Sequence, residues 1–110
     1  MNLVNNNVIK IEDLSESTRS VDMIVKIVSI GQPKNIVTKA NGREHILIEV
    51  LVGDQTGCAY LNFWDDPIKN LKNQDIIKIE KGYISMYRGA LRLNIGRNGK
   101  YKKLRVEQYI

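Results

Sequence analysis

Two alternating runs on either side of a short turn constrain this chain more than any other feature of its sequence. Over residues 45–52 every second side chain is a branched aliphatic one, which is the two-residue period of a half-buried strand. Residues 58–64 alternate in the same way, and the intervening residues 53–57 (GDQTG) have the composition of a turn. The segment predicts an antiparallel β-hairpin. The positions expected to face the core are Ile46, Ile48, Val50, Val52, Ala59, Leu61 and Phe63.

Strand-like runs continue on both sides of this hairpin. Residues 21–27 alternate with a period of two, and strand character resumes over residues 76–81 and 83–95. Asn41-Gly42 can supply the positive φ angles of a tight turn, and Arg88-Gly89 interrupts the run over residues 83–95. A last hairpin is expected at Asn98-Gly99, followed by a strand or strand extension at Leu104 and Val106.

One short helix is expected between the third and fourth strands. Asp65-Asp66-Pro67 offers a carboxylate cap followed by a proline near the first helical position. Ile68 and Leu71 then fit one helical turn that ends by Asn73. Five short strands with a helix at this point are typical of the OB-fold. We therefore predict an all-β protein, a five-stranded OB-fold Greek-key barrel with a short helix between strands 3 and 4.

The length and charge of the chain fit one basic domain. We expect a single OB-fold nucleic-acid-binding domain over residues 11–110, preceded by a flexible N-terminus over residues 1–10. Lys and Arg number 17 against 12 Asp and Glu, which gives a formal net charge of +5. The excess lies in the second half, where residues 81–105 contain eight cations and no acidic residue. A polyanion is therefore the first partner to consider.

The scarcity of metal-binding and nucleophilic residues argues against an enzyme. Cys58 and His45 are the only cysteine and histidine, so neither a disulfide framework nor a Cys-based or His-based metal site is expected. Asp65-Asp66 is explained by the helix cap, and His45 has no partner at a recognisable spacing. We predict no catalytic residue, no metal and no cofactor. Because no apolar run is long enough for a membrane span or a signal peptide, we expect an intracellular protein that does not bind membranes.

Three large aromatic side chains are predicted to point away from the core. Trp64 has the parity opposite to the apolar face of its strand. In the later strand Ile84 and Met86 share the inward parity, which leaves Tyr83 and Tyr87 on the outer face. Aromatic rings beside Lys and Arg suit single-stranded nucleic acid, since every base has a π-face for stacking and the cations follow the phosphates. We expect stacking by Trp64, Tyr83 and Tyr87, and phosphate or polar contacts by Arg88, Arg92, Arg97, Lys34, Lys39, Arg43 and Asn62.

Three segments resemble a known family of nucleic-acid-binding proteins. They read GDQTGCAYLNFWDD, NQDIIKIEKGY and YISMYRGALRLNIGR. A D-x-T-G turn, a Trp closing the third strand and a K-G-Y-x-x-x-[YF]-[KR]-G stretch occur in this order, and together they resemble the simple single-OB, single-stranded-DNA-binding (SSB) proteins of archaea and the human-type SSB proteins, sensors of single-stranded DNA. The resemblance implies stacking by the same three aromatic residues and phosphate contacts by Arg88 and Arg97. Asn94 stands where the eukaryotic relatives carry a further aromatic residue.

The function that we expect is non-catalytic binding of single-stranded DNA with little sequence preference, in replication, recombination or repair. An RNA-binding OB module is an alternative, because nothing in the sequence reads a 2′-hydroxyl. A protein-interaction OB subunit of a DNA-repair complex is another, in which the aromatic residues would bind a partner's peptide. We expect a monomer in the absence of DNA. It would be cytoplasmic and associated with the nucleoid in an archaeal host, and nuclear in a eukaryotic one.

Overall fold

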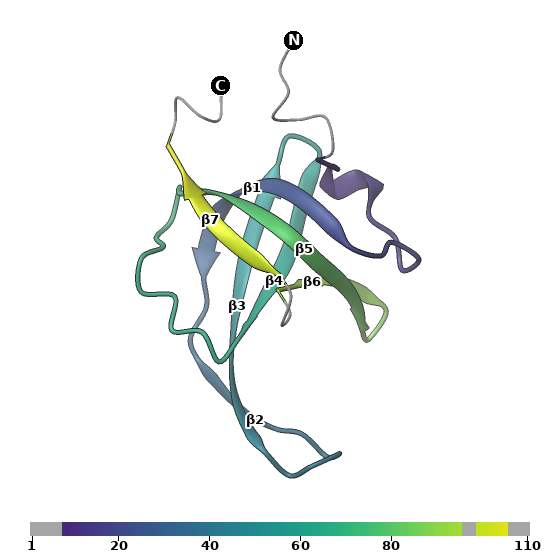
Figure 1. Cartoon of the computed structure of the whole chain (residues 1–110), viewed down its shortest axis with the longest axis vertical. Coiled ribbons are helices and arrows are strands. Elements are labelled where there is room, and N and C mark those ends of the chain that lie inside the picture. The colour runs from purple at the N-terminus through teal and green to yellow at the C-terminus, as the bar shows by residue number, and fades with distance from the viewer. Residues whose placement is uncertain (1–7, 96–98, 106–110) are drawn as a thin grey trace.

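Among the residues that the structure describes, the regular secondary structure is β-strand except for one short 3₁₀-helix (Figure 1). The computed structural model describes residues 8–95 and 99–105 of the chain. Within them no helix is long and apolar enough to cross a membrane. The elements are the 3₁₀-helix η2 (Ile11–Asp13) and the strands β1 (Val21–Ile30), β2 (Lys34–Val37), β3 (Glu44–Asp54), β4 (Gly57–Trp64), β5 (Ile76–Tyr87), β6 (Ala90–Asn94) and β7 (Lys100–Leu104).

Five of the strands close a barrel. β1 pairs with β3 on one side and with β5 on the other, and β3 continues to β4. β6 completes the ring, because it pairs antiparallel with β5 and parallel with β4. The order β1-β3-β4-β6-β5, with closure from β5 back to β1, is that of an OB-fold. The predicted fold is therefore confirmed.

The barrel interior contains most of the apolar side chains that the sequence predicts to face inward from β3 and β4. Val50, Val52 and Leu61 have no exposed surface, and Phe63 is 1% exposed. Ile46, which was expected to face the core, is 46% exposed. It pairs with β2 in the β2–β3 hairpin, which projects from the barrel in Figure 1, and a hairpin outside the barrel has no interior to bury it.

The expected helix after the third barrel strand is absent, because the residues between β4 and β5 form an irregular loop. Asp65 and Ile68 have φ angles of 57° and 50°, which lie in the left-handed region and cannot belong to a right-handed helix. The Asp66 carboxylate accepts a hydrogen bond from the Ile68 N–H at 2.9 Å, a local turn rather than a helix cap. Ile68 is nevertheless buried in the core and Leu71 packs against it, so the two apolar residues of the expected helix still reach the barrel.

Strand β5 is bent so that it can pair with β1 and β7 in its first half and with β6 in its second half. The bend is at Lys81, whose φ is 55°, and at buried Gly82. A Cβ at Gly82 would lie 3.0 Å from Ile79 Cγ2 and 3.2 Å from the Asn94 carbonyl oxygen. Only glycine leaves room for this approach of β5 to β6.

Candidate nucleic-acid interface

A groove with a volume of about 530 Å³ crosses one face of the barrel. Its floor comes from β3, β4 and β6, and its walls come from β2 and the second half of β5. A volume of this size accommodates a small organic ring system such as a nucleobase. The groove is lined by Lys34, Ile36, Leu47, Glu49, Asn62, Trp64, Tyr83, Ser85, Met86, Tyr87, Arg92 and Asn94.

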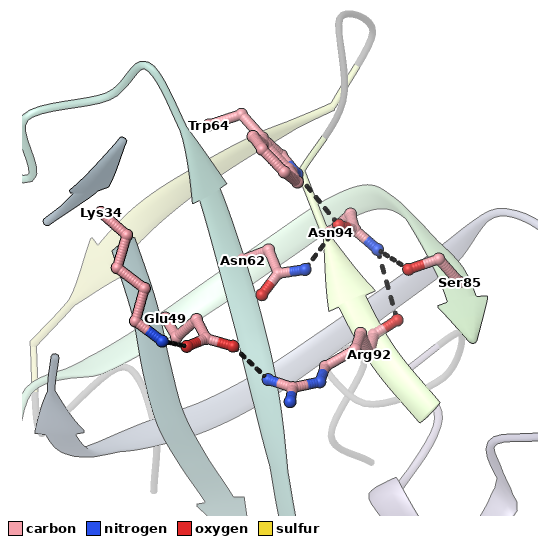
Figure 2. Close-up of polar contacts among 7 residues, drawn as sticks. All are labelled: Lys34, Glu49, Asn62, Trp64, Ser85, Arg92 and Asn94. Carbon is pink, nitrogen blue, oxygen red and sulfur yellow. Dashed lines mark hydrogen bonds and ion pairs between the residues drawn. The ribbon is translucent and has the colours of Figure 1, made fainter. Parts of the chain in front are cut away.

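Trp64, at the end of β4, is held in place from two sides. Its indole Nε1–H donates a hydrogen bond of 3.2 Å to Asn94 Oδ1 on β6 (Figure 2). The ring of His45 meets the Trp64 ring edge-on, with 6.3 Å between the ring centroids. The ring therefore has a defined orientation before any ligand arrives.

A short polar network lies under this ring. Asn94 is 2% exposed, and its Oδ1 also accepts a hydrogen bond of 3.1 Å from Asn62 Nδ2. Asn94 Nδ2 donates to Ser85 Oγ at 2.9 Å and to the Arg92 carbonyl oxygen at 3.3 Å. Both polar atoms of the Asn94 side chain thus have hydrogen-bond partners within the protein. It supports Trp64 from below, at the position where the resemblance suggested a missing aromatic residue.

Tyr83 and Tyr87 stand on the half of β5 that leaves the barrel. They are 43% and 54% exposed, and both line the groove with Trp64. Met86 was expected to face inward, yet it is 46% exposed and lines the groove too. This end of β5 belongs to the β5–β6 hairpin, which extends past the barrel wall. Its side chains of inward parity therefore have no core to pack against. The groove therefore contains more apolar surface than the strand parity predicts.

A tight turn places Arg88 at the tip of the same hairpin. Arg88 and Gly89 have φ angles of 51° and 80°, as in the two-residue type I′ turn that suits the twist of a hairpin. The Arg88 guanidinium lies 5.3 Å from the centre of the Tyr87 ring. The turn thus sets a cation beside the outermost aromatic side chain of the groove.

Glu49 is an acidic residue in the middle of this basic groove. Its carboxylate contacts Lys34 Nζ at 2.6 Å and Arg92 Nη1 at 2.7 Å (Figure 2). The hydrogen bond from Lys34, followed by the charge of Arg92, lowers the pKa of Glu49 below its ordinary value of 4.5. Two of the cations assigned to phosphate from the sequence are therefore paired with a carboxylate in the free protein.

Arg92 is also packed between aromatic rings. Its guanidinium lies 4.6 Å from the centre of the Tyr60 ring and 5.5 Å from that of Tyr87. With Glu49 on one side and two rings around it, this side chain has little rotational freedom left. It forms the rigid cationic edge of the groove.

Of the ten residues predicted from the sequence, the structure gathers six in the groove and places three outside its lining. Lys39 and Arg43 are exposed in the β2–β3 turn, where only Gly42 of the expected Asn41-Gly42 pair has a positive φ. Arg88 is at the hairpin tip, and Arg97 lies outside the described residues. The groove contains the remaining six, Lys34, Asn62, Trp64, Tyr83, Tyr87 and Arg92.

Two groove residues have roles that the sequence did not indicate. Glu49 lies directly across the β3–β4 pair from Asn62, and Asn62 lies directly across the β4–β6 pair from Asn94. The parity of Glu49 was visible in the sequence as outward, but its pairing with two cations from other strands was not. The central role of Asn94 likewise depends on strand neighbours that are far apart in the chain.

The carboxylates near the groove have structural partners. His45 was expected to lack one, but its Nδ1 lies 2.8 Å from Asp65 Oδ2, and this hydrogen bond lowers the pKa of Asp65. Asp65 Oδ1 accepts from the Ile46 N–H at 2.8 Å, so it ties the end of β4 to β3. Asp66 accepts a hydrogen bond of 3.0 Å from the Tyr101 hydroxyl. Among the described residues no group of three or more His, Cys, Asp or Glu side chains could hold a metal ion.

A family model described as single-stranded DNA binding protein Ssb-like, OB fold, matches residues 14–103. The chain belongs to this family. The family indicated by the three sequence segments is therefore confirmed.

The relatives of this Ssb-like chain include an archaeal single-stranded DNA binding protein and OB domains of known structure. The single-stranded DNA binding protein Ssb of Saccharolobus solfataricus is 29% identical over 87 residues, which cover 79% of this chain and 57% of the relative. The chain thus spans less than two thirds of that relative's length. The OB domain of Ta0387 from Thermoplasma acidophilum has a TM-score of 0.76 at 24% identity, covering 90% of this chain and 88% of that one. The replication factor A related protein of Methanobacterium thermoautotrophicum has a TM-score of 0.72 at 22% identity, with coverages of 91% and 93%. These structural likenesses concern the fold.

Proposed function

We propose that this Ssb-like chain binds single-stranded DNA in the groove, without catalysing a reaction. The observation that carries the proposal is that Trp64, Tyr83 and Tyr87, from two different strands, line one groove together with the cation Arg92. The name of the Saccharolobus solfataricus relative supports the same ligand.

Stacking supplies the affinity in this proposal. Each base stacked on an aromatic ring contributes about 1–3 kcal/mol, so three rings contribute about 3–9 kcal/mol before the cost of ordering the strand. Three rings and a groove of this size suit a site of about four to six nucleotides. Stacking depends on the π-face that all bases share, so the three aromatic contacts tolerate any base.

Cations at the groove edge follow the phosphates. Arg88 at the hairpin tip is beside the aromatic site, and Lys34 and Arg92 become available when a phosphate displaces Glu49. Each phosphate neutralised on a single strand contributes about −0.7 to the slope of log affinity against log salt concentration. Three contacts therefore give a slope of about −2.

Fluorescence of Trp64 tests the proposal, because it is the only tryptophan of the chain and lines the groove. A short oligo-dT should quench it at low salt. Tyr83→Ala and Tyr87→Ala should each weaken binding by about five- to 150-fold, the equivalent of one lost stacking contact. Val37→Ala is the control, since Val37 is exposed on β2 outside the groove lining. Oligo-dT that leaves the emission unchanged at low salt would reject the proposal.

The biological setting follows from the ligand. Protection of exposed single strands in replication, recombination or repair is the role that we propose, carried out by a monomer. Matched dT and rU oligomers separate this function from RNA binding. Tighter binding of rU than of dT would replace DNA by RNA as the ligand.

A further inference from the structure

The partners of Asn94 fix the direction of two amide groups on the groove floor. The Trp64 indole N–H can only donate and the Arg92 carbonyl can only accept, so Asn94 must turn its oxygen toward Trp64 and its nitrogen toward Arg92. The same Asn94 oxygen lies 3.1 Å from the Asn62 amide, so Asn62 must turn its nitrogen toward Asn94. Figure 2 shows this arrangement, with the Asn62 oxygen turned away from Asn94. The orientation of Asn62 is therefore determined, through Asn94, by the Trp64 indole and the Arg92 carbonyl.

The Asn62 oxygen is left without a hydrogen-bond partner. Asn62 is 7% exposed, and its Oδ1 is a buried side-chain acceptor to which no described group donates. An unsatisfied buried acceptor costs about 1–3 kcal/mol, so a ligand that brings a donor to this point gains more than an ordinary hydrogen bond. Asn62 lines the groove, but its Oδ1 has almost no exposed surface, so a donor on an occupant of the groove reaches it only when a neighbouring side chain moves aside.

The neighbours of Asn62 extend this acceptor into a pattern. Glu49 lies directly across the β3–β4 pair, and its carboxylate oxygens keep lone pairs beyond those used by Lys34 and Arg92. Lys34 comes from the outer strand β2 and binds Glu49 Oε1. From β2 through β3 to β4 the floor thus presents a donor, an acceptor and a second acceptor.

We propose that this row, Lys34, Glu49 and Asn62, reads the Watson–Crick edge of a guanine. That edge carries an acceptor, O6, followed by two donors, N1–H and the 2-amino group, which is the complement of the row. Lys34 donates to O6, Glu49 accepts from N1–H, and Asn62 accepts from the 2-amino group. The inference rests on the proposed function, since it concerns one base of a strand held in the same groove.

The other three bases leave a repulsive contact in the row. Thymine offers an acceptor, a donor and an acceptor, so its last carbonyl would face the Asn62 oxygen. Cytosine places its ring nitrogen opposite Glu49, and adenine does the same with N1, in each case an acceptor against a carboxylate. Selectivity then comes from unpaired acceptors in the wrong complexes as much as from the bonds to guanine.

Access to the row requires movement of a mobile side chain. Lys34 has 58% of its side chain exposed, whereas Arg92 and Glu49 are 15% and 22% exposed. Lys34 is therefore the member that can move aside and then return to the guanine O6. The stacking positions stay tolerant of any base, and only one base position is selective.

The test compares deoxyguanosine with deoxyinosine, which lacks only the 2-amino group. Oligo-dT of about six nucleotides carries one dG, dI or dA, placed at each position in turn, and quenching of Trp64 gives the affinity. We expect dG at one position to bind about tenfold more tightly than dI or dT there. Equal affinities for dG and dI at every position, with saturable quenching, would overturn the inference and leave the proposed function intact. Quenching by none of the oligomers would reject the proposed function itself.

A substitution at Asn62 tests whether its amide causes the preference for dG over dI. Asn62→Leu should bring the ratio of dG to dI affinity to about one, whatever its effect on total affinity. Lys69→Ala is the control that should keep the ratio, because Lys69 lines a separate hollow beside Tyr101. A tenfold ratio that persists in folded Asn62→Leu would overturn the assignment. If this variant does not fold, the comparison of dG with dI in the unmodified protein decides alone.

Discussion

Replacing Glu49 by glutamine should strengthen the binding of oligo-dT. A phosphate that contacts Lys34 or Arg92 comes to about 5.5 Å from the Glu49 carboxylate, since each cation lies within 2.7 Å of it. The repulsion over this distance is about 0.8 kcal/mol in a water-like medium and about 3 kcal/mol at the effective dielectric constant of a protein surface. Taking about 1 kcal/mol for a partly exposed site, we expect Glu49→Gln to bind oligo-dT about fivefold more tightly at low salt.

The salt dependence separates this explanation from a general gain of positive charge. Glu49 offsets one of the phosphate charges that Lys34 and Arg92 meet in the unmodified protein, so its removal should steepen the log–log slope by about 0.7. Glu44→Gln is the matched control, because it removes the same charge from the same strand at an exposed position outside the groove lining. Titrations of Trp64 fluorescence at several salt concentrations measure both quantities. The same affinity and the same slope for Glu49→Gln and Glu44→Gln would refute competition between Glu49 and the phosphates.

The same carboxylate should contribute to stability in a defined pH range. The pKa of Glu49 is lowered in the folded protein, so its ion pairs stabilise the fold above the ordinary value of 4.5 and lose this effect as the pH falls through the folded pKa. Glu49→Gln should therefore be less stable than the unmodified protein by about 1 kcal/mol at neutral pH. Denaturant unfolding should show this difference disappearing in acid; a difference that grows below pH 4.5 would contradict it.

Three further changes test the frame around the groove. Asn94→Leu removes four hydrogen bonds at a buried site and should cost about 2 kcal/mol of unfolding free energy, whereas exposed Asn70→Leu should cost little. Gly82→Ala places a Cβ 3.0 Å from a core methyl group and should cost about 1–3 kcal/mol, whereas Gly57→Ala, with 3.7 Å of clearance, should be near neutral. Burial, followed by a hydrogen bond to a carboxylate, raises the pKa of Tyr101 to about 12. Its stabilising effect should therefore persist up to pH 10.0 and be lost as the pH rises toward 12, as absorbance titration and unfolding against Tyr101→Phe can check.

The sequence predicts the barrel well because its signals are local. A period of two over residues 45–52 and 58–64 fixes which side chains enter the core, and most of these are buried as predicted. The same rule fails for Ile46 and Met86. Both lie on strand ends that run past the barrel into hairpins, and alternation does not reveal where the enclosing sheet stops.

The missing helix has a different cause. A proline after two aspartates is compatible with a helix start, but the backbone at Asp65 turns left-handed because its carboxylate bonds back to His45 and to the Ile46 N–H. These are contacts between residues about twenty positions apart. A local helix signal is overridden here by pairing between neighbouring strands.

The sequence predicted the aromatic residues of the candidate site and some of its polar residues, but it missed the roles of Glu49 and Asn94. Parity and family resemblance both select Trp64, Tyr83 and Tyr87, and the three side chains do share a groove. A count of cations could not show that Glu49 forms ion pairs with both Lys34 and Arg92, because these three residues come from three different strands. The distribution of charge along a chain predicts the sign of the partner's charge better than it predicts which cations are available to bind that partner.

Trp64 has two separable properties in this structure, a ring and a proton. Phenylalanine at this position would keep a stacking surface but would take away one of the two donors to the Asn94 oxygen. The Arg92 carbonyl would still hold the Asn94 nitrogen, so both amides below would keep their direction. A substitution normally regarded as conservative for base stacking would in this chain separate the stacking surface from the hydrogen bond that orients it.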